Sequence, residues 1–238
     1  MMDKQLKTRK QLKAETKTLF KGNWKSAILI SLIGVLTYIV YLRLYASEYS
    51  RLFNSESGSY VPPLNLNPTV SALMIFLVLI FEILLMGASY AFLTWVSSKK
   101  TPERAFTQSF QVFSNELFFS TITLAILKTI YTIFWYLLLF FPAIIKHYSY
   151  SQAFMINKDL QDNPNHPDIK TNKKITLSRQ LMNGHKFDLF VLDLSLLGWY
   201  LLSLITLGIG FIWFLPYQKA VKANFYRDLA GDQFLTLK

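Results

Sequence analysis

Two residues of opposite charge, Glu82 and Lys128, lie inside long apolar stretches of the sequence. At about 1.5 Å per helical residue, Glu82 lies about 18 Å from the outer end of its stretch, and Lys128 about 16 Å from the inner end of its own. A lone charge at that depth of a bilayer costs at least about 2.5–3.5 kcal/mol, so each requires a partner or water. We therefore predict an intramembrane Glu82–Lys128 pair. It either fixes how two helices pack, which we favour, or belongs to an ion or proton pathway.

Other side-chain chemistry has little support in the sequence. Asp188 and Asp193 lie near the inner end of the last apolar stretch, where we expect them to face Lys186 or a polar seam between helices. The histidines are His147, His166 and His185. Their spacing fits no helical metal site, and the HExxH, GxSxG, P-loop and GxGxxG motifs are all absent. We expect no enzymatic activity, no cofactor and no metal.

Four apolar stretches must position these residues. They cover 26–42, 70–96, 117–145 and 187–216. Of the 238 residues, 52% are hydrophobic and only 16% are charged, against roughly 25% charged in an average soluble domain. A bilayer-spanning helix needs about 20 mostly apolar residues. The composition therefore predicts an all-α, polytopic helical membrane protein, and the absence of cysteine excludes disulfides and thiolate metal sites.

Lysine and arginine are unevenly distributed between the connecting segments. Residues 1–25 and 97–116 are rich in them, whereas 43–68 contains no lysine. Because these residues collect on the cytoplasmic side of a membrane, we expect the N-terminus inside and 43–68 outside. The segment 146–186 and the C-terminus are also basic and are expected inside. This pattern predicts attraction to anionic lipid headgroups and no binding of nucleic acid, which would need a basic face on a folded soluble domain.

If the segment 146–186 and the C-terminus are both cytoplasmic, the third and fourth apolar stretches must each enter the membrane and return. This gives between four and six membrane segments. We assign the break in the third stretch to Pro142, followed by a return to about residue 157. In the fourth stretch we assign the break to Gly208, Gly210 and Pro216. Glycine and proline interrupt helical hydrogen bonding, and interrupted segments in corresponding positions are typical of sites near the midplane. The alternative is that they only kink spanning helices.

The chain divides into a basic cytoplasmic segment over 1–25, one helical membrane domain over 26–230, and a tail over 231–238. The membrane domain includes a cytoplasmic loop over 158–186. This loop is the best candidate for contact with anionic headgroups or a partner on the inner face, and the alternative is a connector lying on the inner leaflet. The residues assigned to this contact are Lys173, Lys174, Arg179, His185 and Lys186.

Several short strings occur in order along nearly the whole chain. They are Lys21-Gly22-Asn23-Trp24, Pro142-Ala143-Ile144-Ile145-Lys146, Tyr150-Ser151-Gln152-Ala153, Asp162-Asn163-Pro164, Ser178 to Lys186, Gly198-Trp199, Thr206 to Tyr217 and Phe225-Tyr226. In these strings the chain resembles a family of bacterial integral-membrane proteins known as domain of unknown function nine-seven-five. The resemblance implies a multi-helix protein of the cytoplasmic membrane. It implies no activity, because the family has no established reaction or ligand.

The predicted topology and the intramembrane charges are compatible with two functions. The first is a non-enzymatic scaffold or regulatory protein that contacts lipid, or another membrane protein, through its basic inner face. The second is a small transporter or permease component that uses the broken segments around Glu82 and Lys128.

Overall fold

The computed structural model of the chain describes residues 6–53, 67–138, 140–165 and 169–237. All regular structure in these ranges is helical. Four helical segments are long and apolar enough to cross a membrane: Trp24–Ser47, Pro68–Ser98, Leu117–Leu137 and Lys186–Ile205. The predicted class, an all-α polytopic membrane protein, is confirmed.

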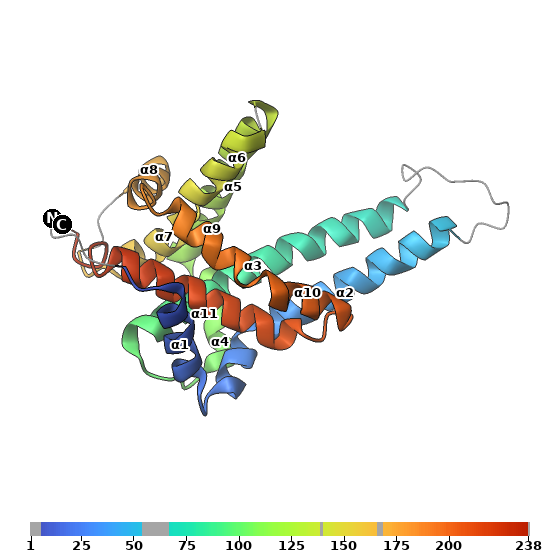
Figure 1. Cartoon of the computed structure of the whole chain (residues 1–238). Helices are drawn as coiled ribbons and strands as arrows, with labels where there is room; N and C mark the ends of the chain where they lie inside the picture. The colour runs from blue at the N-terminus through green and yellow to red at the C-terminus, as the bar shows by residue number, and fades with distance from the viewer. Residues whose placement is uncertain (1–5, 54–66, 139, 166–168, 238) are drawn as a thin grey trace.

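The helices are labelled in chain order in Figure 1. They are α1 (Arg9–Phe20), α2 (Trp24–Phe53), α3 (Pro68–Ser98), α4 (Ala105–Gln108), the 3-10 helix η2 (Ser109–Phe113), α5 (Asn115–Leu138), α6 (Phe140–Ser149), α7 (Ala153–Asp162), α8 (Thr171–Leu181), α9 (Lys186–Leu194), α10 (Leu197–Ile205) and α11 (Phe211–Ala230). In Figure 1, α2 and α3 form a long arm, and α5 and α6 form a shorter arm that points in another direction.

The long arm is packed against the rest of the protein only along part of its length. Asn67 caps α3 by accepting from the Thr69 backbone N–H at 3.0 Å, and Pro68 occupies the first turn, where proline is favoured. In the half of α3 nearer its start, Ile75 and Phe76 are 63% and 58% exposed, whereas Phe92 in the other half is fully buried. Such an apolar, exposed surface is stable when lipid surrounds it.

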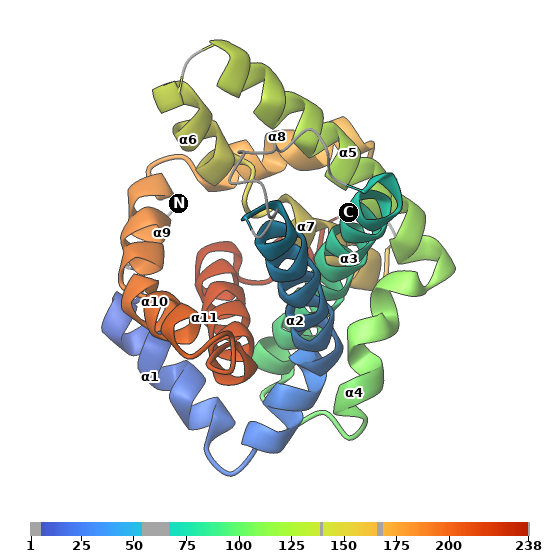
Figure 2. The same cartoon turned by 90° about the vertical axis from the view of Figure 1, so that its right-hand side faces the viewer.

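The third apolar stretch folds back on itself. α5 ends at Leu138, α6 begins at Phe140, and the two helices lie side by side (Figure 2). Pro142 stands in the first turn of α6, where a proline is tolerated because that N–H has no helical partner. The break therefore precedes Pro142, which corrects the prediction. α6 is about 15 Å long, too short to cross a bilayer, and the chain continues beyond residue 157 as α7.

The fourth stretch folds back at its glycines. Gly208 has a φ of 91°, a left-handed conformation that glycine adopts without strain. A Cβ atom on Gly210 would lie 2.7 Å from the Cα atom of Ser203, so only glycine fits there. These two residues form the predicted break between α10 and α11. Pro216 forms none, because α11 continues through it from Phe211 to Ala230, and this too corrects the prediction.

Both ends of the described chain pack onto the helical domain. In α1, Leu12 and Phe20 are buried, and the Asn224 side-chain amide of α11 donates to the Leu12 carbonyl at 3.2 Å. Near the C-terminus, the Asn163 side-chain amide donates to the carbonyls of Phe234 and Leu237 at 3.0 and 2.8 Å. The described residues 6–25 and 231–237 thus pack onto the same helical domain.

Candidate functional site

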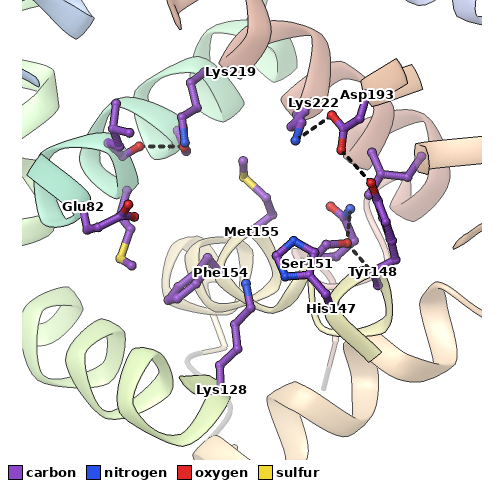
Figure 3. A pocket seen from close by; sticks show the side chains of 15 residues that line it. Glu82, Lys128, His147, Tyr148, Ser151, Phe154, Met155, Asp193, Lys219 and Lys222 are labelled. Carbon is purple, nitrogen blue, oxygen red and sulfur yellow. Dashed lines mark hydrogen bonds and ion pairs between the residues drawn. The ribbon is translucent and has the colours of Figure 1, made fainter. Parts of the chain in front are cut away.

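A polar chamber of about 220 Å³ lies where α3, α5, α6, α7, α9 and α11 converge (Figure 3). Met155 and Leu189 are among its apolar lining residues, and Ser151 and Gln152 line it from the turn between α6 and α7. Its acidic and basic lining residues are Glu82, Lys128, His147, Asp193, Lys219 and Lys222. We call this region the chamber.

The turn between α6 and α7 is held by the neighbouring helix α8. The Ser178 hydroxyl donates to the Ser149 carbonyl at 2.8 Å and accepts from the Gln152 backbone N–H at 3.2 Å. Ser178 is fully buried, so this double hydrogen bond is shielded from competition with solvent. It fixes the position at which Ser151 and Gln152 enter the chamber wall.

Glu82 and Lys128 lie in the same chamber, but they do not form the predicted direct pair. Within the described part of the chain, no ion pair within 4 Å joins them. The Lys128 ammonium instead lies 4.9 Å from the centroid of the Phe154 ring, a cation–π contact. The two charges are therefore brought to one site across α3 and α5, with space between them (Figure 3).

Asp193 faces a polar seam between helices, one of the two environments expected for it. Its Oδ1 lies 2.7 Å from the Lys222 Nζ of α11 as an ion pair, without the alignment of a hydrogen bond. The Tyr148 hydroxyl of α6 donates to Oδ2 at a long 3.5 Å. Asp188 instead contacts His185, with Nδ1 and Oδ2 3.1 Å apart, at an exposed position.

Lys219 and Lys222 belong to the site but were not predicted to, because both lie in the basic C-terminal region whose charges were assigned to topology. The spacing of Lys219 and Lys222 could have indicated that they lie on one face of a helix. Residues three apart share one face of a helix, and here they are the lysines of an otherwise mostly apolar stretch over 211–226. Both side chains line the chamber from α11 (Figure 3).

A second cavity, of about 480 Å³, lies between α6, α8 and the start of α9. We call it the basic pocket. Its charged residues are Lys146, Arg179 and Lys186, and no carboxylate is among its described lining residues. Burial, and then the charges of Arg179 and Lys186, lower the pKa of Lys146 below its ordinary value. The Lys146 ammonium also lies 4.4 Å from the centroid of a Trp135 ring.

Of the five residues predicted for inner-face contact, only Arg179 and Lys186 line this pocket. Lys174 donates to the Asn157 side-chain carbonyl at 2.7 Å and to the Ser120 hydroxyl at 2.8 Å, which draws it toward α5 and α7. Lys173 is exposed on α8, and His185 contacts Asp188. Lys146 joins the pocket although it is distant in sequence, because α6 packs against α9.

A buried network joins α3, α7 and α11 beside the chamber. The Asp159 carboxylate accepts from the Tyr226 hydroxyl and from Arg227 Nη2, both at 2.7 Å. Arg227 Nε also donates to the Ser97 hydroxyl at 2.9 Å. Burial raises the pKa of the Asp159 carboxyl, while the hydrogen bond and charge of Arg227 oppose that shift. We regard this network as structural, because its side chains are bonded to one another.

His147 lines the chamber, and His166 lies outside the described residues. Within the described ranges, no group of three His, Cys, Asp or Glu residues has a geometry that could hold a metal ion.

Comparison with known proteins gives one family match. No curated protein and no solved structure matches the chain. The model of the family described as "Protein of unknown function (DUF975)" matches residues 1–164 and 143–233. Because these matches extend over far more than half of the sequence, the chain belongs to the DUF975 family, as the ordered strings predicted.

Proposed function

We propose that the protein is a non-enzymatic scaffold or regulatory protein of the cytoplasmic membrane that holds anionic lipid headgroups in the basic pocket. Three cations meet there without a carboxylate among the described lining residues, and this observation carries the proposal. Arginine and lysine are suited to phosphate oxygens, the former as a bidentate donor. The Gln180 and Asn183 side chains line the same pocket and add amide donors.

The surroundings of the pocket also suit a lipid. Ile145 and Phe187 stand beside its cations in the sequence and are 54% and 71% exposed. Apolar side chains next to basic ones are typical of the boundary between headgroups and acyl chains. Trp135, which contacts Lys146, is a residue type enriched at that boundary.

The proposed orientation places the pocket and both termini in the cytoplasm. It is supported by the basic segments at 1–25 and 146–186, and by the hydrogen bond from the Lys7 backbone N–H to Asp228 Oδ2 at 2.7 Å, which joins the two ends of the chain. The anionic surface of the cytoplasmic leaflet attracts such basic segments.

The test is the retention of lipid by the purified chain. Native mass spectrometry would count the phosphatidylglycerol molecules that stay bound, with phosphatidylcholine as the neutral comparison. The triple variant Lys146→Gln, Arg179→Gln, Lys186→Gln should lose about a hundredfold in affinity, since each cation contributes about 1 kcal/mol at an anionic surface. The matched control removes three exposed cations elsewhere, Lys10, Lys21 and Lys100. Equal retention by the two triple variants would overturn the proposal.

The chamber favours a second candidate, a transporter or permease component. It lies about midway along α3 and α5, and α6 and α11, the helices that follow the two breaks, contribute to its wall. Broken segments around a site near the midplane are typical of transporters. The distinguishing measurement is solute flux into vesicles by a well-folded wild type and by Glu82→Gln. Flux that Glu82→Gln abolishes would favour transport over scaffolding.

A further inference from the structure

Two lysines of the chamber form no ion pair with any residue that the structure describes. Lys128 comes from α5 and Lys219 from α11, and they enter the chamber from opposite sides (Figure 3). Among the described residues, neither lysine side chain forms an ion pair or donates a hydrogen bond, and the Lys128 ammonium lies over the Phe154 ring. Cations inside a membrane domain are costly unless a counter-charge or water offsets them.

The other charges of the chamber do not offset both lysines. Lys222 is paired with Asp193 at 2.7 Å, so these two charges compensate each other. Glu82 is then the one carboxylate left among the described lining residues to face Lys128 and Lys219, and it lies beyond ion-pair distance of both. With histidine neutral, the chamber thus carries one uncompensated positive charge.

The size and the polar lining limit what could fill the space. The volume of about 220 Å³ is smaller than that of pockets for drug-sized ligands, about 300–1,000 Å³. Ser151, Gln152 and Tyr148 bring hydroxyl and amide groups to the wall, which can bind oxygen atoms of a ligand. A ligand of a few heavy atoms with one negative charge matches these properties.

We propose that the chamber binds a small anion with a carboxylate or phosphate group between Lys128 and Lys219. Glu82 bounds this anion site and limits the charge that it accepts, because a carboxylate repels a second negative charge at short range. Lys222 and Asp193 hold α11 against α9 and so keep Lys219 at the chamber wall. The site shares no lining residue with the basic pocket.

The experiment is calorimetric titration of the full chain in phosphatidylcholine nanodiscs with potassium phosphate and with sodium acetate, at constant ionic strength set by chloride. The wild type should bind at least one of them saturably. Lys128→Met and Lys219→Met should each weaken that binding about tenfold or more, because each removes a charged donor. The matched control is Lys100→Met, an exposed lysine outside the chamber, which should bind like the wild type.

The variant Glu82→Gln tests the anion site even if a lysine variant misfolds. It removes a repulsive charge and should tighten binding severalfold, a result that misfolding cannot produce. A second set of nanodiscs containing phosphatidylglycerol distinguishes a headgroup from a free anion. Phosphate binding lost in those nanodiscs means that the chamber takes a lipid phosphate, and unchanged binding means that it takes a soluble anion. Absence of saturable binding to both probes, or binding by Lys128→Met and Lys219→Met equal to that of Lys100→Met, would overturn the proposal.

Discussion

The chamber and the basic pocket each gather three cationic side chains, but among the described lining residues only the chamber also contains carboxylates. In the basic pocket, burial lowers the pKa of Lys146 most, and repulsion from Arg179 and Lys186 lowers it further. In the chamber, one pair joins α9 to α11 and the remaining charges come from α3, α5 and α11. Chamber charges should therefore bear on the fold as well as on binding, whereas pocket charges should bear mainly on binding and only weakly on stability.

The largest effect should come from the turn that returns α11 to the chamber. Gly210→Ala places a Cβ against the Ser203 backbone, a contact at 2.7 Å that no rotamer relieves, and should cost about 3 kcal/mol of stability. Thermal unfolding in detergent measures this loss. Because α11 carries Lys219, phosphate binding should fall as well, while retention of phosphatidylglycerol should stay unchanged.

Gly198→Ala in α10 is the matched control for this change, because a Cβ there meets no atom within 4 Å. It should leave stability unchanged or raise it slightly, since alanine favours helix. Equal melting temperatures for the two variants would show that the close approach at Gly210 does not hold the turn.

A smaller effect is expected at the ion pair of the chamber. Asp193→Ala leaves Lys222 without its partner and should destabilise the protein by about 2 kcal/mol, less than a fully buried pair because both groups are partly exposed. The comparison variant is Asp188→Ala, which removes an exposed carboxylate near His185 and should cost about 0.5 kcal/mol or less. Similar losses of stability in Asp193→Ala and Asp188→Ala would show that the chamber ion pair stabilises the fold no more than an exposed pair does.

The smallest effect is expected in the basic pocket. A lysine whose pKa is lowered by folding destabilises the folded state while protonated, so stability should rise as pH rises through the folded pKa of Lys146 toward 10.5. Arg179→Gln removes one cause of the lowered pKa and should make this rise shallower. At neutral pH it should change stability by about 0.5 kcal/mol or less.

Melting temperatures measured from neutral pH upward test this prediction. Lys173→Gln, an exposed position outside the pocket, is the control and should keep the wild-type slope. If Arg179→Gln leaves the pH dependence of the melting temperature unaltered, the charge of Arg179 does not lower the pKa of Lys146.

Local sequence patterns were sufficient for the membrane class and for one of the two reversals. Apolar runs of spanning length define helices irrespective of their partners. Gly208 and Gly210 act through backbone conformation and close approach, which are also local. Proline was less informative, because its effect depends on its place in a helix: Pro142 lies in a first turn, and α11 continues through Pro216.

Contacts between helices could not be read from sequence to the same degree. Depth alone suggested that Glu82 and Lys128 would pair, but helix rotation and tilt decide whether two side chains meet, and here they share a chamber without direct contact. Asp159 and Arg227 bond to each other at 2.7 Å across 68 residues, and no periodicity marks them. Lys219 and Lys222 share a helix face, but the other residues that line the chamber come from five other helices.

The central claim is that the chamber and the basic pocket are two separate sites for anionic groups. The most direct test is the phosphate titration of the Lys146→Gln, Arg179→Gln, Lys186→Gln variant in phosphatidylcholine nanodiscs. Our account predicts the wild-type phosphate affinity, because none of these residues lines the chamber. Loss of phosphate binding in this variant would contradict it.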